Sequence, residues 1–342
     1  TPSRPRHRPH PDARPGTAPP TSPPTDRPAE TPPFGAEVRD VVVRYSRGDD
    51  PALDGATLTI RPGVITGLLG RNGAGKTTLA ALLAAFRRPT SGTVRVGPDG
   101  ELEDPFENVW ATMHTQLVRE SGDVGESDKA RDTLEYYADV RPHWDADLAG
   151  RLLDTFEVDV RKKPNELSRG KRSALGAVVG LAARAPLTIF DEVYLGMDAP
   201  SRYAFYDALV ADYAEHPRTI LLSSHLIAEV ERLFEDVVMI DRGRVLLAEN
   251  ADDVRARGIS LTGPADVVER HTAGREVLAR QRLGSTAQVT LFGTFAPDER
   301  AAAAAAGLEV GAVPVQDLFV HLTRTDRTED GASARTRTQE AR

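Results

Sequence analysis

The chain has 342 residues, with 43 Lys plus Arg against 51 Asp plus Glu for a formal net charge of −8, and it contains no cysteine. The acidic balance argues against a surface built to follow nucleic acid, and the missing cysteines exclude disulfides, thiolate metal sites and cysteine nucleophiles. The sequence has no apolar run of about 18 residues, which a membrane-spanning helix needs, and no apolar core of a secretory signal at its start. We therefore expect a cytosolic protein.

The two ends of the chain differ in composition from the rest. Residues 1–34 hold 12 of the 25 prolines, and residues 325–342 are polar and charged. Such segments bury too little apolar surface to offset the entropy lost on ordering, so both are predicted to be disordered tails. Residues 35–255 carry the motifs described below and are predicted to form one domain. The residue pattern changes after about residue 256. Residues 256–324, which contain no chemical motif, are predicted to form a small accessory domain.

Between the tails, short apolar runs alternate with helical patterns. Strands are expected at 38–45, 56–60, 64–69, 93–96, 187–190, 219–222, 237–240 and 244–247. Helices are expected at 76–86, 132–138, 145–156, 171–184, 201–215 and 226–234, and the whole of 103–165 reads as mainly helical. Strands and helices in alternation predict a mainly parallel sheet covered by helices.

A glycine-rich segment follows the strand expected at 64–69. It fits the pattern G-x-x-x-x-G-K-[ST] and comprises Gly70, Arg71, Asn72, Gly73, Ala74, Gly75, Lys76, Thr77 and Thr78. Between a strand and a helix, such a loop turns consecutive backbone N–H groups towards phosphate oxygens at the positive end of the helix. Lys76 is predicted to reach the β and γ phosphates, and the Thr77 hydroxyl to bind Mg²⁺.

Two carboxylates follow the buried strand expected at 187–190. Asp191, at the carboxyl end of that strand, is predicted to hold the Mg²⁺ that the phosphates also bind. Glu192 is then predicted to orient or deprotonate the water that attacks the γ-phosphate. Together with the phosphate loop, these residues predict an ATPase that uses ATP and Mg²⁺.

These residues and several others, in this order, resemble the ATP-binding cassette (ABC) family in its transporter ATPase form. Leu167-Ser168-Arg169-Gly170-Lys171 resembles the family's signature loop, and the run from Asp191 to Asp198 resembles its Walker B and D-loop. His225 resembles the switch histidine, and Tyr45, 31 residues before Lys76, resembles the aromatic residue that stacks on adenine. The resemblance covers about residues 36–250.

The resemblance implies an α/β fold: a P-loop NTPase (RecA-like) core, an antiparallel β subdomain and a helical signature subdomain at about residues 105–185, followed by the accessory domain. It also implies a head-to-tail homodimer or ABC heterodimer. Each of two MgATP molecules would lie between one chain's phosphate loop and the other chain's signature loop. Ser168 and Gly170, which precede a helix, would form this second anion site, beyond the reach of their own chain's phosphate loop. His225 would join Lys76 and Glu192 as a catalytic residue that contacts the γ-phosphate.

The chain departs from the family pattern at several positions. Arg169 and Lys171 replace the usual Gly and Gln of the signature loop, which adds positive charge beside the phosphate of the other chain's ATP. Val193 replaces a usual Pro. For the Q-loop, spacing favours Glu120 as a further Mg²⁺ or water contact, while Gln116 is the glutamine nearby.

Short runs around residues 141–145, 173–176 and 185–192 are similar to ATPases of Gram-positive two-component exporter systems. This resemblance implies a separate membrane-spanning permease as partner and a peripheral location on the cytoplasmic face of the membrane. Trp110, Tyr136, Tyr137 and Trp144 would either line the groove for the permease or fill the core of the helical subdomain. Transport direction, expected to be export, rests on resemblance alone.

Two other functions fit the sequence less well than a transporter ATPase. A soluble cassette acting on ribosomes or DNA fits poorly, since translation-type cassettes carry two copies and repair-type cassettes insert long coiled coils, whereas Lys76 and Asp191 are 115 residues apart. A regulator that binds nucleotide without hydrolysis is disfavoured by Lys76, Asp191 and Glu192. Nucleic acid is not expected as a partner.

Overall fold

The computed structural model describes residues 31–46, 48–120, 128–293 and 295–323. The predicted tails therefore lie outside the described residues, apart from residues 31–34 at the end of the first one. Phe34 already belongs to a strand, in which its side chain is fully buried.

The largest sheet has six strands in the order β5-β6-β7-β3-β8-β9. The first five run parallel, and β9 pairs antiparallel with β8 at one edge. Their bounds are β3 (Ile65–Gly70), β5 (Thr115–Arg119), β6 (Leu187–Asp191), β7 (Thr219–Ser224), β8 (Asp236–Asp241) and β9 (Arg244–Asn250). The four central strands are buried along their whole length, as expected of strands covered on both faces.

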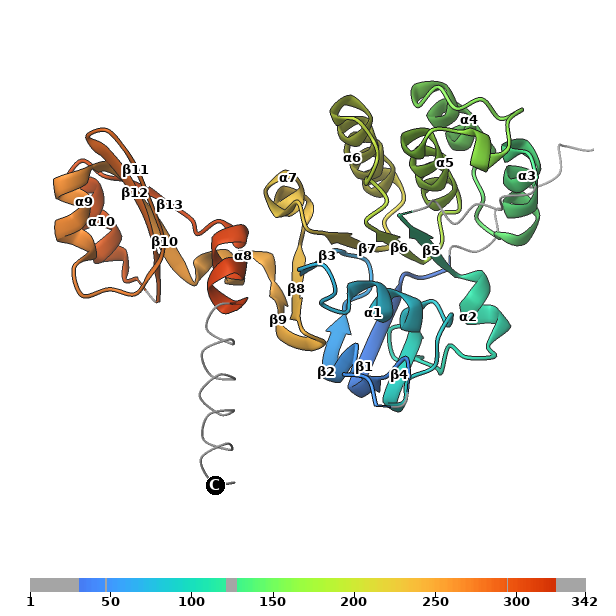
Figure 1. The fold of residues 1–342 in the computed structure, drawn as a ribbon, viewed down its shortest axis with the longest axis horizontal. Helices are drawn as coiled ribbons and strands as arrows, with labels where there is room; N and C mark the ends of the chain where they lie inside the picture. The colour runs from blue at the N-terminus through green and yellow to red at the C-terminus, as the bar shows by residue number, and fades with distance from the viewer. Residues whose placement is uncertain (1–30, 47, 121–127, 294, 324–342) are drawn as a thin grey trace, which may run out of the picture. The chain divides into compact units, whose positions relative to one another are not determined.

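Alternate residues of these strands enter two different cores. On one face, Leu68 and Ile189 pack with helix α1 (Lys76–Leu83) and with a second, antiparallel sheet in the order β2-β1-β4. That sheet consists of β1 (Phe34–Val43), β2 (Leu53–Ile60) and β4 (Ser91–Pro98). On the other face, Leu69 and Phe190 pack with helices that lie across the sheet from α1 in Figure 1. The sheet is thus the middle layer of a three-layer arrangement.

The helices of that second face are rich in small and apolar residues. They are α3 (Ala130–Val140), α4 (Ala146–Thr155), α5 (Arg169–Ala182) and α6 (Ala199–Glu215), with the short helix η1 (Pro164–Glu166) before α5. Asp145 and Asp198 cap α4 and α6 by accepting hydrogen bonds from backbone N–H groups. The predicted fold class, an α/β core with an antiparallel β part and a helical part, is confirmed.

Two expectations about secondary structure were wrong. The stretch expected to be mainly helical contains a buried strand, β5, next to the short helix α2 (Val109–Met113). The five residues of β5 include only two apolar ones, Leu117 and Val118, so they carry no periodicity that separates strand from helix, and only pairing with β6 decides the conformation. The helix expected at 226–234 is broken into α7 (Ile227–Val230) and the short helix η2 (Glu231–Leu233).

Residues after 257 form a third sheet, in the order β11-β12-β10-β13, with all its pairs antiparallel. It comprises β10 (Gly258–Pro264), β11 (Val277–Leu283), β12 (Thr286–Phe292) and β13 (Glu309–Gly311), with α8 (Ala251–Ala256) before it and α9 (Ala265–Thr272) and α10 (Pro297–Ala305) on it. Leu261 and Val289 belong to a small core of its own. Residues 315–323 are helical, and Leu318 and Phe319 instead belong to the main core.

Candidate functional site

The phosphate loop begins where β3 ends and closes at the N-terminus of α1. Gly75, the N-cap of this helix, has φ 112°, and a Cβ there would lie 2.7 Å from the carbonyl oxygen of Ala52. Both facts require glycine. The Lys76 ammonium is turned back into the loop, where Nζ donates to the carbonyl oxygens of Gly70 at 2.8 Å and Arg71 at 3.2 Å. Arg71, Asn72 and Gly73 are exposed around it.

The carboxyl ends of the neighbouring strands bring polar side chains to the same edge of the sheet. Asp191 ends β6 and pairs in register with Ser223 of β7. The Ser223 hydroxyl donates to Oδ1 of Asp191 at 2.6 Å, and both side chains are buried. This hydrogen bond fixes one carboxylate oxygen of Asp191 and leaves the second oxygen for a ligand.

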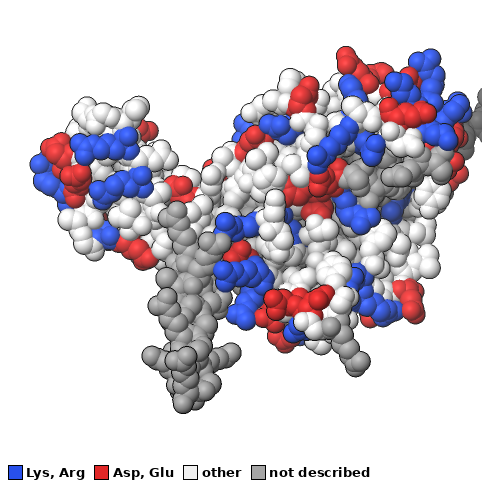
Figure 2. Space-filling view, in the orientation of Figure 1, with Lys and Arg blue, Asp and Glu red and all other residues white. Residues whose placement is uncertain are grey.

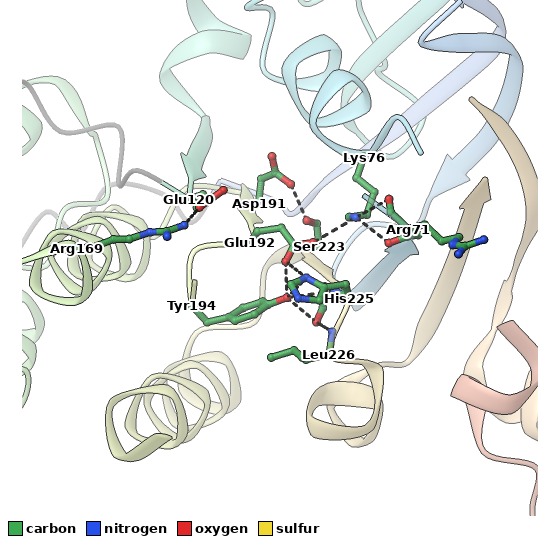
Figure 3. A network of polar contacts seen from close by, with 12 residues as sticks. Arg71, Lys76, Glu120, Arg169, Asp191, Glu192, Tyr194, Ser223, His225 and Leu226 are labelled. Atoms are coloured by element: carbon green, nitrogen blue, oxygen red, sulfur yellow. Dashed lines mark hydrogen bonds and ion pairs between the residues drawn. The ribbon is translucent and has the colours of Figure 1, made fainter. Parts of the chain in front are cut away.

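Glu192 leaves the sheet in a left-handed conformation, with φ 55°, which is uncommon for a residue other than glycine. Its side chain is nearly buried, and Oε1 lies 3.2 Å from Nζ of Lys76. Oε2 lies 2.7 Å from Nδ1 of His225 and accepts a hydrogen bond from the hydroxyl of Tyr194 (Figure 3). Strained conformations of this kind are concentrated at active sites, where the surrounding structure holds them. Glu192 is thus fixed between the phosphate loop and His225.

A cavity of about 680 Å³ opens at this edge of the sheet. Its lining residues are mostly charged, with both signs represented: Thr77, Arg119, Glu120, Arg169, Arg172, Asp191 and Glu192. Carboxylates and a hydroxyl suit a small hard cation, and the arginines suit an anion such as phosphate. The three residues predicted to bind Mg²⁺, namely Thr77, Asp191 and Glu120, therefore lie around one space together with Glu192.

The donor set at this cavity fits Mg²⁺. Thr77, Asp191 and Glu120 supply oxygen ligands from three different elements. Within the described part of the chain, no group of three or more His, Asp or Glu residues stands ready to hold a metal by itself. Mg²⁺ matches this sparse set, because it keeps several water ligands and is usually bound through one or two carboxylates together with substrate phosphates.

The two Q-loop candidates lie in different environments. Gln116 is 2% exposed within β5, and its Nε2 donates to the backbone carbonyl of Leu117 at 3.0 Å. Glu120 follows the end of β5 and lines the cavity. The spacing argument that favoured Glu120 thus agrees with its position beside the phosphate loop.

The signature run begins α5. Ser168 is the N-cap and accepts a hydrogen bond from the backbone N–H of Lys171 at 3.3 Å, while Leu167 is buried. Arg169 forms an ion pair with Glu120 of its own chain (Figure 3), so its guanidinium lines the same cavity as Thr77. A Cβ at Gly170 would lie 2.6 Å from the carbonyl oxygen of Gly196.

Arg169 and Lys171 both contact groups of their own chain. Arg169 pairs with Glu120, and Nζ of Lys171 donates to the carbonyl oxygen of Phe156 at 2.6 Å and lies 3.3 Å from Glu157. The expectation that both cations lie beside the ATP of a second chain stays a prediction.

Tyr45, Thr78 and Asp198 complete the set of predicted residues. The Tyr45 hydroxyl lies 3.1 Å from Oγ1 of Thr78 on α1, and the Arg87 guanidinium lies 3.8 Å from the centre of its ring. The ring is 56% exposed, so its other face is available for stacking. Asp198 caps α6, and its hydrogen bonds with Ser201 lower the pKa of this carboxyl.

Sequence reasoning missed Tyr194, whose hydroxyl joins Glu192 to Ser224 and His225. The sequence did contain a signal for it, because this large aromatic residue lies two positions after Glu192, the candidate base. It also assigned no role to Ser223, which occupies the same strand end on β7 as Asp191 does on β6.

Comparison with known proteins identifies the family of this chain. Residues 53–194 match the family described as ABC transporter. The chain is 32% identical over 225 residues to the mycobactin import ATP-binding/permease protein IrtB of Mycolicibacterium thermoresistibile, covering 63% of this chain and 38% of that protein. It is 33% identical to the taurine import ATP-binding protein TauB of Chromobacterium violaceum, covering 59% of this chain and 77% of TauB.

A solved structure gives the same fold. The dimeric ATP-binding cassette MJ0796, in a post-hydrolysis state bound to ADP and Pi, superposes with a TM-score of 0.55 at 20% identity. The superposition covers 63% of this chain and 98% of that one. The chain therefore belongs to the ABC transporter family, as an ATP-binding cassette ATPase.

Proposed function

We propose that the protein is the ATP-binding and ATP-hydrolysing subunit of an ABC transporter, which dimerises around two MgATP molecules to drive a membrane-spanning permease. The observation that carries this proposal is the cavity lined by Thr77, Asp191 and Glu192, with Oε1 of Glu192 3.2 Å from Nζ of Lys76. Family membership supports ATP as the nucleotide. Because the chain spans 38% of the length of IrtB, transport and partners are assigned as proposals.

Each residue at the cavity has a role that follows from its chemistry. The Gly70–Thr78 loop binds the phosphates, with Lys76 at the β and γ phosphates in place of its present carbonyl contacts. Thr77 and Asp191, with Glu120 nearby, would hold Mg²⁺, which neutralises phosphate charge when bound. Oε1 of Glu192 accepts the proton of the attacking water, and His225 contacts the γ-phosphate. Tyr45 stacks on the adenine.

A second chain completes each site in this proposal. The backbone N–H groups at the start of α5, with the Ser168 hydroxyl, form an anion site at a helix N-terminus. The dimeric state of MJ0796 supports this arrangement, with Asp198 at the contact between the two chains. Loss of the γ-phosphate would then release the dimer and convert hydrolysis into motion.

A permease partner is supported by exposed aromatic side chains beside the helical part. Of the four aromatic residues considered, Tyr137 and Trp144 pack against the main core, whereas Trp110 is 41% and Tyr136 61% exposed. We propose that these two exposed side chains contact the permease. None of the helices in the described ranges is long and apolar enough to cross a membrane.

The division of the chain into residues 35–255 and 256–324 is proposed in a modified form. The sheet of β10 to β13 has its own core, which supports an accessory domain. The helical residues 315–323 pack with the main core, however, and the backbone N–H of Val315 donates to Oε2 of Glu231 at 3.1 Å. We therefore assign this last segment to the cassette.

Affinity purification of tagged Glu192→Gln protein from host membranes with MgATP tests the transporter role. We expect a multi-span membrane protein, on a separate polypeptide, to co-purify in near equal amount. An assay of cargo movement in vesicles then gives the direction of transport, which we predict to be export. Lys76→Ala protein is the matched control, since it should fail to close around ATP. Recovery with ribosomes or DNA would contradict the transporter role and favour the soluble alternative.

The surface charge bears on this alternative. On the face that Figure 2 shows, Lys and Arg are interspersed with Asp and Glu, which does not favour binding of nucleic acid.

A further inference from the structure

A buried tyrosine lies directly behind Glu192. Tyr194 follows two residues later, its side chain is 1% exposed, and its ring packs in the main core with its centre 6.5 Å from that of Tyr206. Only its hydroxyl reaches the polar site (Figure 3). A phenol in this position is costly to bury unless each of its hydrogen-bonding positions is used.

All three hydrogen-bonding positions of this hydroxyl have partners. It donates to Oε2 of Glu192, because a carboxylate can only accept. Its two lone pairs face the backbone N–H of His225 at 3.2 Å and the hydroxyl of Ser224 at 3.0 Å. Ser224 in turn accepts from the backbone N–H of Leu226 at 2.9 Å, which leaves its own proton for Tyr194. Nδ1 of His225 also lies 3.3 Å from this hydroxyl. Donation of the phenol proton to Glu192 leaves the hydroxyl as an acceptor towards its other neighbours.

The two oxygens of Glu192 are consequently unequal. Oε2 is held by Tyr194 and by Nδ1 of His225 at 2.7 Å, which must carry a proton to donate there. Oε1 has no hydrogen-bond partner among the described residues and lies 3.2 Å from Nζ of Lys76, on the side of the phosphate loop. One oxygen is anchored, and the other faces the place where the γ-phosphate is expected.

We propose that Tyr194 is a positioning residue, whose hydroxyl anchors Oε2 of Glu192 so that Oε1 is the oxygen that receives the proton of the attacking water. The proposal rests on the ATPase function proposed above. Tyr194, Glu192 and His225 then act as one hydrogen-bonded unit, in which rotation of the carboxylate is prevented before water arrives. Preorganisation of this kind removes a reorganisation cost from the chemical step.

The chemistry of the phenol supports this role. Burial raises the pKa of Tyr194 far above its usual value, and the neighbouring Glu192 carboxylate raises it further. Tyr194 therefore keeps its proton over the whole physiological pH range and remains a donor to Oε2. The left-handed backbone of Glu192 points to the same conclusion, because a strained conformation persists only where neighbouring contacts hold it.

The test is Tyr194→Phe, which removes one oxygen and keeps the ring in the core. We expect kcat for ATP hydrolysis to fall about 10-fold to 100-fold, as for other residues that orient a catalytic group, while KM and the Kd of a fluorescent ATP analogue stay within about twofold. Because Tyr194 and His225 hold the same oxygen of Glu192, the double variant Tyr194→Phe/His225→Ala should have a kcat only slightly below that of the less active single variant. A merely structural role predicts effects on kcat that multiply.

Tyr206→Phe is the matched control. Tyr206 is equally buried, and its hydroxyl has no hydrogen-bond partner among the described residues. We expect wild-type kcat, and an equal loss in both variants would overturn the proposal in favour of core packing. Wild-type kcat in Tyr194→Phe would also overturn it, while hydrolysis abolished by Lys76→Ala would show that the ATPase function still holds. An inactive wild-type protein that binds ATP would instead contradict the ATPase function itself.

A second variant covers the case in which Tyr194→Phe fails to fold. Ser224→Ala keeps the tyrosine in place and removes one of the two groups that orient its hydroxyl. We expect a smaller fall in kcat, of about threefold to tenfold, again without a change in KM. An unchanged kcat in a folded Ser224→Ala protein would then count against the proposed unit.

Discussion

The parallel sheet around β3 and β6 and the antiparallel sheet from β10 to β13 differ in where their strands end. In the parallel sheet, β3, β6 and β7 end at the same edge, so the phosphate loop, Asp191 and Ser223 meet there although they are far apart in sequence. In the antiparallel sheet, neighbouring strands end at opposite edges. Parallel topology thus gathers polar groups at one edge, whereas antiparallel topology distributes them.

The two sheets also differ in what their side chains do. The four central strands of the parallel sheet are buried on both faces, and β6 ends in Asp191, directly before Glu192. The antiparallel sheet has a small core, and its edge strand β11 is largely exposed, with Leu283 87% exposed. The first sheet is built as a platform for a site, and the second as a packing unit. The following predictions test this difference, beginning with the largest effect.

Substitutions at the edge of the parallel sheet should abolish turnover. Lys76→Ala removes the cation that contacts Glu192 and is proposed to contact the phosphates, and Glu192→Gln removes the proposed proton acceptor. We expect either change to lower kcat by on the order of 10³ or more, as for the loss of a central catalytic group. The measurement is phosphate release at saturating MgATP, with Lys162→Ala at an exposed lysine as control. Unaltered turnover in either variant would remove the site assignment.

Leu→Ala substitutions that create a cavity in one sheet or the other should differ in their effect on ATP binding. Leu261 is 2% exposed in the core of the antiparallel sheet, and Leu68 is fully buried in β3 beneath the phosphate loop. Each Leu→Ala change should lower the free energy of unfolding of its own part by about 2–5 kcal/mol. Hydrogen exchange shows which part of the protein has lost stability, and titration with a fluorescent ATP analogue measures the affinity for ATP. We expect Leu68→Ala to weaken ATP binding and Leu261→Ala to leave it unchanged. An equal loss of ATP affinity in Leu68→Ala and Leu261→Ala would mean that the two sheets act as one unit.

The edge strand β5 provides a finer test of the same principle. Glu120 lies beyond its end at the cavity, and Gln116 lies buried within it. Glu120→Ala should lower kcat by about 10-fold and change its dependence on Mg²⁺ concentration, because a carboxylate oxygen is lost near the cation. Gln116→Ala should lower stability and keep the Mg²⁺ dependence of the wild type. The reverse pattern would assign the Q-loop role to Gln116.

The smallest expected effect is at Tyr45, which lies outside the parallel sheet. Stacking on an aromatic ring contributes about 1 kcal/mol, so Tyr45→Ala should weaken ATP binding about fivefold. Tyr45→Phe keeps the ring and removes only the hydroxyl that contacts Thr78, so it is the control and should bind ATP as the wild type does. Equal affinity of all three proteins, by titration calorimetry, would show that the ring does not contact the adenine.

Several features were accessible from the sequence because they depend on local pattern. The loop from Gly70 to Thr78 carries its own turn and helix start, and the apolar strands ending in Gly70 and Asp191 needed only short runs of hydrophobic residues. Strand β5 could not be predicted in this way, because its five residues take their conformation from pairing with β6. The broken helix after His225 is similar, since isolated helices of one turn have no stability of their own.

Three parts of the candidate site could be predicted from the sequence: a phosphate loop, a strand followed by Asp191 and Glu192, and a histidine after the next strand. These depend on residue type and spacing, which are printed in the chain. The tertiary structure alone decided that Arg169 pairs with Glu120, that Lys171 binds Phe156, and that Tyr194 holds Glu192. Such pairs depend on which side chains face each other once strands and helices have packed, and packing is a property of the whole chain.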